Sequence, residues 1–262
     1  MIRVCQLYKS FGPLAVMKDL NLEVVSGETL VVLGRSGVGK SVLLKHILGL
    51  TQPDSGYVEV DGVNITKLKK AALYQSISHM GMLFQGSALF DSLSVEANTG
   101  FHLHQHGNLK EGRAYSTREI QERVDWALKM VGLEGTQKKM PSDLSGGMKK
   151  RAGLARLIAY KPSYLLYDEP TTGLDPVTAM QINELIIQTQ RELKATSIVV
   201  THDIVSALTI ADRLALVEDG KILHIDAPEP FMQIQNPTIE ALKNTVAVDP
   251  RSLRRIKDAG IS

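Results

Sequence analysis

The chain has 262 residues, of which 44% are hydrophobic, enough for one large α/β domain or a core with an inserted subdomain. Its 30 basic and 28 acidic residues give a net charge of +2, so no nucleic-acid partner is expected. The single cysteine, Cys5, excludes an internal disulfide and a cysteine-cluster metal site. No apolar run approaches the roughly 20 residues of a membrane span, and no signal peptide is visible, so we expect a cytoplasmic protein.

The first part of the chain predicts β structure around a glycine-rich turn. Residues 2–8 and 20–33 alternate apolar and polar side chains, as strands do, with a turn at Gly27. The apolar run 30–33 leads through glycines into "KSVLLKHILGL", where apolar residues cover one broad helical face. "PDSGYVEVDGVNIT" (53–66) predicts further strand structure between two turns.

Strand signals fade between Ser87 and Tyr160, where charged helical segments such as "TREIQERVDWALKMVGL" predict a helical insertion. Apolar strands follow at 164–168, 197–202 and 213–219, and the last of these turns into "KILHID". Helical segments separate these strands, so we expect crossover connections and a largely parallel sheet that is covered on both faces.

"GRSGVGKS" (34–41) fits the P-loop pattern G-x-x-x-x-G-K-[ST] between a predicted strand and a predicted helix. Glycines let successive N–H groups bend around phosphate oxygens, and the helix N-terminus adds partial positive charge. Lys40 offers a mobile charge to the β- and γ-phosphates, and Ser41 offers a hydroxyl to Mg²⁺. The alternative is a glycine-rich turn with an exposed lysine. The predicted phosphate-binding residues are Gly34, Arg35, Ser36, Gly37, Val38, Gly39, Lys40 and Ser41.

A pair of carboxylates ends the apolar strand in "YLLYDEP" (164–170), where open α/β sheets hold their ligands. Asp168 can hold Mg²⁺ through its water shell, and Glu169 can orient or deprotonate an attacking water. A helix cap or a salt-bridge partner is the alternative for such a pair. The P-loop in the same chain favours the catalytic interpretation.

Together with "LSGGM" (144–148), these motifs resemble an ATP-binding cassette (ABC) ATPase, the motor subunit of ABC transporters, over residues 1 to about 230. The expected elements occur once each and in the family's order. The resemblance implies an α/β fold with a RecA-like P-loop NTPase core, an antiparallel β subdomain and an inserted helical subdomain. The expected divisions are core residues 1–86, helical subdomain 87–160, core residues 161–235 and a C-terminal extension 236–262.

The resemblance also assigns roles to three residues beside the P-loop. Phe11 in "KSFG" would stack on adenine, Gln85 in "MLFQ" would touch Mg²⁺ and the attacking water, and His202 in "VVTHD" would contact the γ-phosphate. Each has a plain alternative: a core aromatic, a surface amide and a hydrogen-bonding residue at a strand end. The implied cofactors are ATP and Mg²⁺.

The "LSGGM" loop implies a second copy of the chain. In the family, Ser145, Gly146 and Gly147 present N–H and O–H donors to the γ-phosphate bound on a partner subunit, and Asp175 of "GLD" lies at the interface. Donors aimed at developing charge each lower a barrier by about 2.7–4 kcal/mol. Since each motif occurs once, we expect a head-to-tail homodimer.

Met148 stands where the family commonly has glutamine, either as a packing substitution or as a subfamily mark. Together with "GKSVLLKHILGL" and "MGMLFQGSALFDSLSVEAN", the "LSGGM" loop makes the chain resemble the ATPases of Mla-type and Mce-associated lipid transport systems. That resemblance implies an integral membrane permease, an Mce-domain lipid-binding protein, and a peripheral position on the cytoplasmic face of the inner membrane. The alternatives are an importer of amino acids or another solute, and a soluble ABC-type ATPase of translation or DNA repair.

Three further stretches and one aromatic residue carry expectations of their own. In "GSALFDSLSVEAN" (86–98), residues such as Leu89, Phe90, Leu93 and Val95 form a groove for a permease helix or pack a core. "HLHQH" (102–106) is interpreted as a solvated linker without a metal, and Trp126 as a packing residue. After Gln235 we expect a flexible tail, with a clasp on another subunit as the alternative.

Overall fold

The centre of the molecule is a six-stranded sheet in the order β10-β9-β3-β8-β7-β6. The computed structural model describes residues 1–108 and 111–243. The neighbours from β9 to β6 are parallel, and only β10 runs antiparallel to its neighbour. The strands are β3 (Thr29–Leu33), β6 (Met80–Leu83), β7 (Tyr164–Asp168), β8 (Thr196–Thr201), β9 (Arg213–Glu218) and β10 (Lys221–Asp226).

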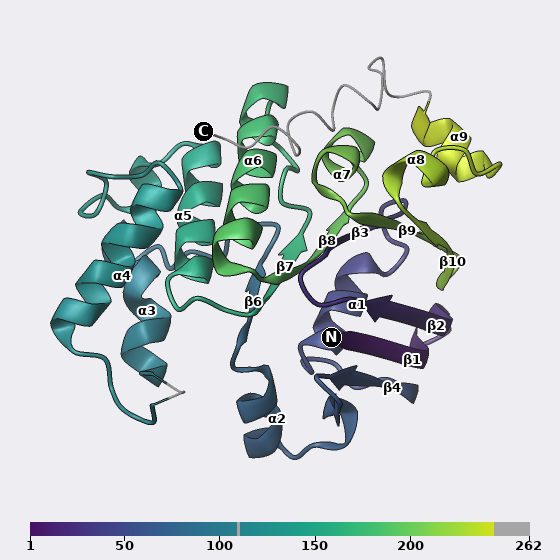
Figure 1. The fold of residues 1–262 in the computed structure, drawn as a ribbon, viewed down its shortest axis with the longest axis horizontal. Helices are drawn as coiled ribbons and strands as arrows, with labels where there is room; N and C mark the ends of the chain where they lie inside the picture. Colours follow the sequence, from purple (N-terminus) through teal and green to yellow (C-terminus); the bar gives the residue numbers. More distant parts are fainter. Residues whose placement is uncertain (109–110, 244–262) are drawn as a thin grey trace.

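A second, antiparallel sheet has the order β2-β1-β4-β5. Its strands are β1 (Ile2–Phe11), β2 (Leu14–Val24), β4 (Ser55–Val60) and β5 (Val63–Asn64). One edge of this sheet also meets the main sheet, because Lys18 in β2 donates its N–H to the carbonyl of Gly220 at 2.9 Å. This contact places the end of β1 and the start of β2 next to the carboxyl ends of the parallel strands (Figure 1).

The helices separate into groups (Figure 1). Helix α1 lies between the two sheets, α6 and α7 cover the opposite face of the main sheet, and α3, α4 and α5 stand together at one end. The helices are α1 (Lys40–Ile47), α2 (Lys70–Ile77), α3 (Val95–His106), α4 (Thr117–Met130), α5 (Gly146–Ile158), α6 (Pro176–Leu193), α7 (Ile204–Ile210), α8 (Pro228–Phe231) and α9 (Pro237–Lys243). Two short 3₁₀ turns cover Ile65–Lys67 and Pro141–Asp143.

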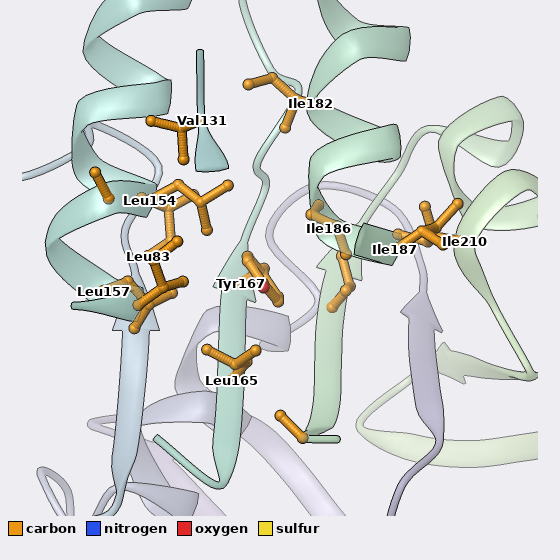
Figure 2. Close-up of a cluster of buried hydrophobic side chains, with 14 of the residues drawn as sticks. Leu83, Val131, Leu154, Leu157, Leu165, Tyr167, Ile182, Ile186, Ile187 and Ile210 are labelled. Atoms are coloured by element: carbon orange, nitrogen blue, oxygen red, sulfur yellow. The ribbon is translucent and has the colours of Figure 1, made fainter. Parts of the chain in front are cut away.

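Alternation along the central strands divides the interior into two hydrophobic clusters. In β3, Val31 and Leu33 face the helical cluster, while Leu30 and Val32 face the cluster that contains α1 and the antiparallel sheet. All four side chains are fully buried, which stabilises the fold by about 1.5–3 kcal/mol for each. Figure 2 shows the helical cluster, in which side chains of α5 and α6 close over β7 and β6. The parallel, covered sheet that the sequence predicts is confirmed.

The linker predicted at 102–106 is wrong, because these residues form the last turns of α3. Ser94 caps this helix by accepting a hydrogen bond from the N–H of Ala97, and Leu103 is buried in the core. The ring of His102 stacks on Tyr160 with centroids 3.9 Å apart. Ring packing and a cap, rather than charge, therefore decide the structure of this histidine-rich stretch.

The flexible tail predicted after Gln235 is also wrong for Pro237–Lys243, which form α9. Asn236 accepts hydrogen bonds from the N–H groups of Thr238 and Ile239, and Ile239 is fully buried. The Thr238 hydroxyl donates to Glu218 at 2.9 Å. The rest of the predicted tail, 244–262, lies outside the described residues.

Trp126 packs against the helical cluster as the sequence predicts, partly buried on α4. The ammonium of Lys161 lies 4.7 Å from its ring centroid. Among the residues that the structure describes, no helix has both the length and the apolar character that crossing a bilayer requires.

Candidate functional site

The turn between β3 and α1 depends on glycine for its shape. Gly37 and Gly39 have φ of +85° and +100°, a region that side chains other than glycine rarely adopt. A Cβ on Gly39 would lie 2.5 Å from Cγ1 of Val16, and one on Gly34 would lie 2.7 Å from the carbonyl oxygen of Val217. The backbone can therefore pass close to its neighbours and leave its N–H groups directed at a ligand at the N-terminus of α1.

Lys40, the first residue of α1, folds back into this turn. Its buried ammonium donates to the carbonyl oxygens of Gly34 at 2.8 Å and Arg35 at 3.0 Å. The same ammonium forms an ion pair with Oε1 of Glu169 at 3.2 Å. A buried cation held mainly by carbonyl oxygens is suited to exchange those partners for phosphate oxygens.

Ser41 and Asp168 bring two oxygen ligands together beside the turn. The hydroxyl of Ser41, in the first turn of α1, donates to Oδ1 of Asp168 at 2.7 Å. Asp168 is the last residue of β7 and is buried. Carboxylate and hydroxyl oxygens are the ligands that Mg²⁺ prefers, so this pair fits that ion.

Glu169 follows β7 in a left-handed conformation, with φ of 47°. A residue other than glycine adopts this conformation at a cost of about 1–3 kcal/mol, and such outliers gather at functional sites. Its N–H donates to the carbonyl of Val200 at 2.9 Å. Its Oε2 accepts from the hydroxyls of Thr172 at 3.2 Å and Thr201 at 3.3 Å, and lies 2.9 Å from Nδ1 of His202. The carboxylate is thus fixed in direction at the strand ends.

These groups surround one cavity of about 410 Å³, a size typical of small-molecule sites. Phe11, at the end of β1, is 49% exposed and forms its outer wall. The lining residues are Phe11, Val16, Ser36, Gly37, Gly39, Lys40, Ser41, Val42, Gln85, Glu169, Thr172 and His202. The fold therefore brings together residues that the sequence predicts for adenine, phosphate, water and metal contacts.

The other predicted P-loop positions, Gly34, Arg35 and Val38, do not line this cavity but lie next to residues that do. Gly34 and Arg35 offer their carbonyl oxygens to Lys40. Val38 is partly buried against the cluster beneath α1. Asp168 reaches the cavity through its hydrogen bond with Ser41.

Residues of the "LSGGM" loop and Asp175 do not line this cavity. Ser145 caps α5 and accepts a hydrogen bond from the N–H of Met148 at 3.3 Å, and Gly146 begins the helix. Asp175 caps α6. A Cβ on Gly147 would lie 2.6 Å from Cγ2 of Thr178, so the two helix N-termini lie side by side.

Lys150, in the second turn of α5, belongs to the site although sequence reasoning missed it. Its buried ammonium donates to the main-chain carbonyls of Gln85 and Glu169, the latter at 3.5 Å. Burial lowers the pKa of Lys150, and the charges of Asp168 and Glu169 oppose that shift. The available signal was the basic run after "LSGGM", which did not reveal a main-chain partner.

A family model and two solved structures define the class of protein. A family model described as "ABC transporter" matches residues 17–172. A solved dimeric ATP-binding cassette, MJ0796 bound to ADP and Pi, is 31% identical with a TM-score of 0.77, over 87% of this chain and 99% of that chain. CbiO1 of Clostridium perfringens, part of the ABC transporter complex cbiONQ, is 28% identical with a TM-score of 0.81, over 98% of both chains.

Relatives with assigned names indicate which kinds of ABC transporter ATPase the chain is similar to. The ATP-binding protein MlaF of an intermembrane phospholipid transport system in Haemophilus influenzae is 39% identical, over 90% of this chain and 87% of that protein. MlaF of Escherichia coli is 35% identical, over 93% and 88%. A probable ribonucleotide transport ATP-binding protein, mkl, of Mycobacterium leprae is 37% identical, over 98% and 72%.

The chain belongs to the ATP-binding subunits of ABC transporters, and it is an ATPase of that family. The predicted fold, a P-loop NTPase core with an antiparallel β subdomain and a helical subdomain, is confirmed. The predicted resemblance to Mla-type ATPases is confirmed by the similarity to the MlaF proteins.

Proposed function

We propose that this ATPase drives a transporter that moves phospholipid between membranes of the cell envelope. The observation that carries the proposal is the similarity to MlaF proteins over nine-tenths of the chain, combined with the gathering of Phe11, Lys40, Ser41, Gln85, Glu169 and His202 around one cavity. The chain would act at the cytoplasmic face of the inner membrane, as a peripheral subunit bound to an integral permease. An Mce-domain lipid-binding protein would complete the system.

The hydrolytic step follows from the contacts of Glu169. In the free chain its carboxylate is paired with Lys40, the cation that would bind the β- and γ-phosphates. When ATP binds, its phosphates take over the ammonium, and Glu169 is then free to orient a water and accept its proton. His202, 2.9 Å from the carboxylate, contacts the γ-phosphate from the end of β8. Phe11 stacks on the adenine.

Mg²⁺ would be held by Ser41, Gln85 and Asp168. When bound, the ion neutralises charge that develops on the phosphate oxygens. The Ser41 hydroxyl donates to Oδ1 of Asp168 at 2.7 Å, so these two oxygens are close enough to serve as ligands of one ion. Gln85 lines the same cavity and can contact both the ion and the water.

A second copy of the chain would complete each site. Ser145, Gly146 and Gly147 lie outside the chain's own nucleotide cavity, at the N-terminus of a helix that can donate N–H groups to a phosphate on a partner. Asp175 would lie beside them at the same interface. The solved structures of the MJ0796 cassette are dimeric, which supports the pairing of two copies. Hydrolysis removes the shared γ-phosphate and thereby releases the two copies.

The permease would bind beside Gln85. A cavity of about 220 Å³ lies there between the loop after β6 and helices α3 and α5, and its lining includes Phe84, Ala88 and Phe101. Phe84 and Phe90 are 39% and 38% exposed, so an apolar helix face of the permease can pack on them. Of the residues first expected to form this groove, Val95 is buried and Leu89 packs against the core.

Gentle detergent extraction of a tagged chain, followed by mass spectrometry, tests this function. We expect to recover a small permease, an Mce-domain protein and phospholipid. A chain carrying Phe84→Glu should lose these partners and still bind ATP, because Phe84 lies outside the nucleotide cavity. Recovery of no membrane protein by the unmodified chain would contradict the transporter role and favour a soluble ABC ATPase.

A second candidate cargo is a solute. The name of the mycobacterial relative specifies ribonucleotide transport, which keeps the motor and changes the substrate class. Recovery of a different permease with a solute-binding protein, and no enriched phospholipid, would favour this candidate. An importer of amino acids would give the same kind of result with a different binding protein.

A further inference from the structure

The ammonium of Lys150 connects two segments of the nucleotide site that are distant in sequence. Gln85 lies in the loop after β6, and Glu169 lies in the loop after β7. Both offer their main-chain carbonyl oxygens to the same buried cation. Burying an ammonium is unfavourable unless its hydrogen bonds are satisfied, so these contacts bind the two loops to α5.

One and two helical turns after Lys150, the same face of α5 also contacts the loop that follows Gln85. Gly153 and Arg156 follow Lys150 at intervals of three residues, which places them on one helix face. A Cβ on Gly153 would lie 3.1 Å from the carbonyl oxygen of Ser87, a tight contact, so glycine at this position lets the loop lie close against the helix. Arg156 donates to the carbonyl of Ala88 at 2.7 Å.

The loop itself is strained where α5 holds it. Ser87 and Ala88 have φ of 63° and 47°, both in the left-handed region. Asn98 of α3 holds the loop's far end, accepting from the N–H of Phe90 at 2.8 Å and donating to its carbonyl at 3.0 Å. Because contacts from two helices maintain this conformation, the position of Gln85 depends on the position of α5.

We propose that Lys150 is a positioning residue for ATP hydrolysis. Its ammonium fixes the main chain of Gln85 and Glu169, so that the helix beginning at the "LSGGM" loop also sets the geometry of the chain's own hydrolytic site. This inference rests on the proposed function. In a head-to-tail dimer, α5 would contact the partner's nucleotide at its N-terminus and its own site through Lys150. Each α5 would then link the two sites.

Steady-state ATP hydrolysis by the full-length variant Lys150→Met tests this inference. We expect kcat to fall about 10- to 100-fold, because small displacements of reacting groups have effects of this size. The KM for ATP and the affinity for a fluorescent ATP analogue should stay within about threefold, since Lys150 does not line the nucleotide cavity. The Mg²⁺ concentration for half-maximal rate should rise as Gln85 moves. Lys150→Arg should restore most of the rate, because its guanidinium can donate to both carbonyls.

The neighbouring Arg151→Met is the matched control. Arg151 also donates to main-chain carbonyls, those of Val131 at 3.5 Å and Gly132 at 3.2 Å, but away from the site. It should lower stability and leave kcat and the Mg²⁺ requirement unchanged. A folded Lys150→Met whose kcat lies within threefold of Arg151→Met would overturn the inference, as would a parallel loss of kcat and ATP affinity.

Two further results keep the test decisive. If Lys150→Met does not fold, Lys150→Gln replaces it, and a folded Lys150→Gln with the unmodified protein's rate and Mg²⁺ requirement also overturns the inference. Absence of ATP hydrolysis by the unmodified chain within its transporter complex would instead contradict the proposed function. The two failures are therefore distinguishable.

Discussion

The pairing of Lys40 with Glu169 places the cation that we propose for phosphate binding next to the carboxylate that we propose as the proton acceptor. Their contact of 3.2 Å is buried, and each group keeps other partners: carbonyl oxygens for the lysine, and Thr172, Thr201 and His202 for the glutamate. If ATP binding breaks the ion pair, these other contacts would keep the carboxylate oriented. Under the proposed function, binding and hydrolysis then depend on different members of the pair.

The variants Glu169→Gln and Lys40→Ala separate these two roles. Glu169→Gln should slow turnover by about 10²–10⁴-fold, or about 3–5 kcal/mol, because the proton acceptor is lost while the phosphate contacts remain. Lys40→Ala should instead weaken ATP binding itself. Single-turnover hydrolysis and equilibrium binding of ATP measure the two effects. Full activity in Glu169→Gln would exclude the role that we give to this glutamate.

Short motifs predict the residues that gather at the site, but they do not reveal a side chain such as Lys150, whose partners are the main-chain carbonyls of distant loops. The pattern "GRSGVGKS" and the pair Asp168 and Glu169 predict residues that the fold gathers at one site. Lys150 binds the carbonyl oxygens of two distant loops. Every residue carries a carbonyl, so no residue type marks such a partner in the sequence.

Among the elements, the buried strands are predicted best and α3 worst. The strand at 164–168 is found with the predicted bounds, because a continuous apolar run ended by carboxylates allows few alternatives. In α3, polar and histidine side chains obscure the helical period. The start of α9 could have been predicted from the sequence, because Asn236 followed by proline is a helix-start signal.

The environment of His102 in α3 predicts a pH dependence of stability. Burial, and then the charges of His106 and Arg156, lower the pKa of His102 from 6.5 to about 4, and its ring stacks on Tyr160. The folded protein therefore holds His102 neutral, while the unfolded chain binds its proton below pH 6.5. His102 should thus stabilise the fold fully above this pH, and that contribution should be lost as the pH falls toward 4.

Urea unfolding between neutral pH and about pH 5 measures this effect. The variant His102→Phe keeps an aromatic ring against Tyr160 and removes the titrating group, so its free energy of unfolding should depend less on pH. His104 is exposed on the same helix, and His104→Phe is the matched control that should keep the original slope. Equal slopes in all three proteins would contradict the prediction.

At the scale of the whole molecule, the order of motifs along the chain predicted more than composition did. The near-neutral charge only reduced the case for nucleic acid, whereas the sequence of P-loop, "LSGGM" loop, carboxylate pair and histidine defined the fold class. The fold then explains why motifs of one nucleotide site stand far apart in the sequence. The lining of the candidate nucleotide cavity includes residues in the segments that follow β3, β6, β7 and β8, whereas the "LSGGM" loop stands outside that lining, at the start of α5.

Hydrolysis by mixtures of two inactive variants tests the central claim, that each ATP site is shared between two copies. Lys40→Ala removes the P-loop cation, and Gly146→Asp places a carboxylate where the partner's γ-phosphate would bind. Nothing lies within 4 Å of a Cβ on Gly146, so the substitution fits its own chain. Each variant alone should be nearly inactive. An equal mixture should recover up to about one quarter of the unmodified rate, because half of the dimers then have one intact site. A mixture no more active than the two variants measured separately would contradict the shared site.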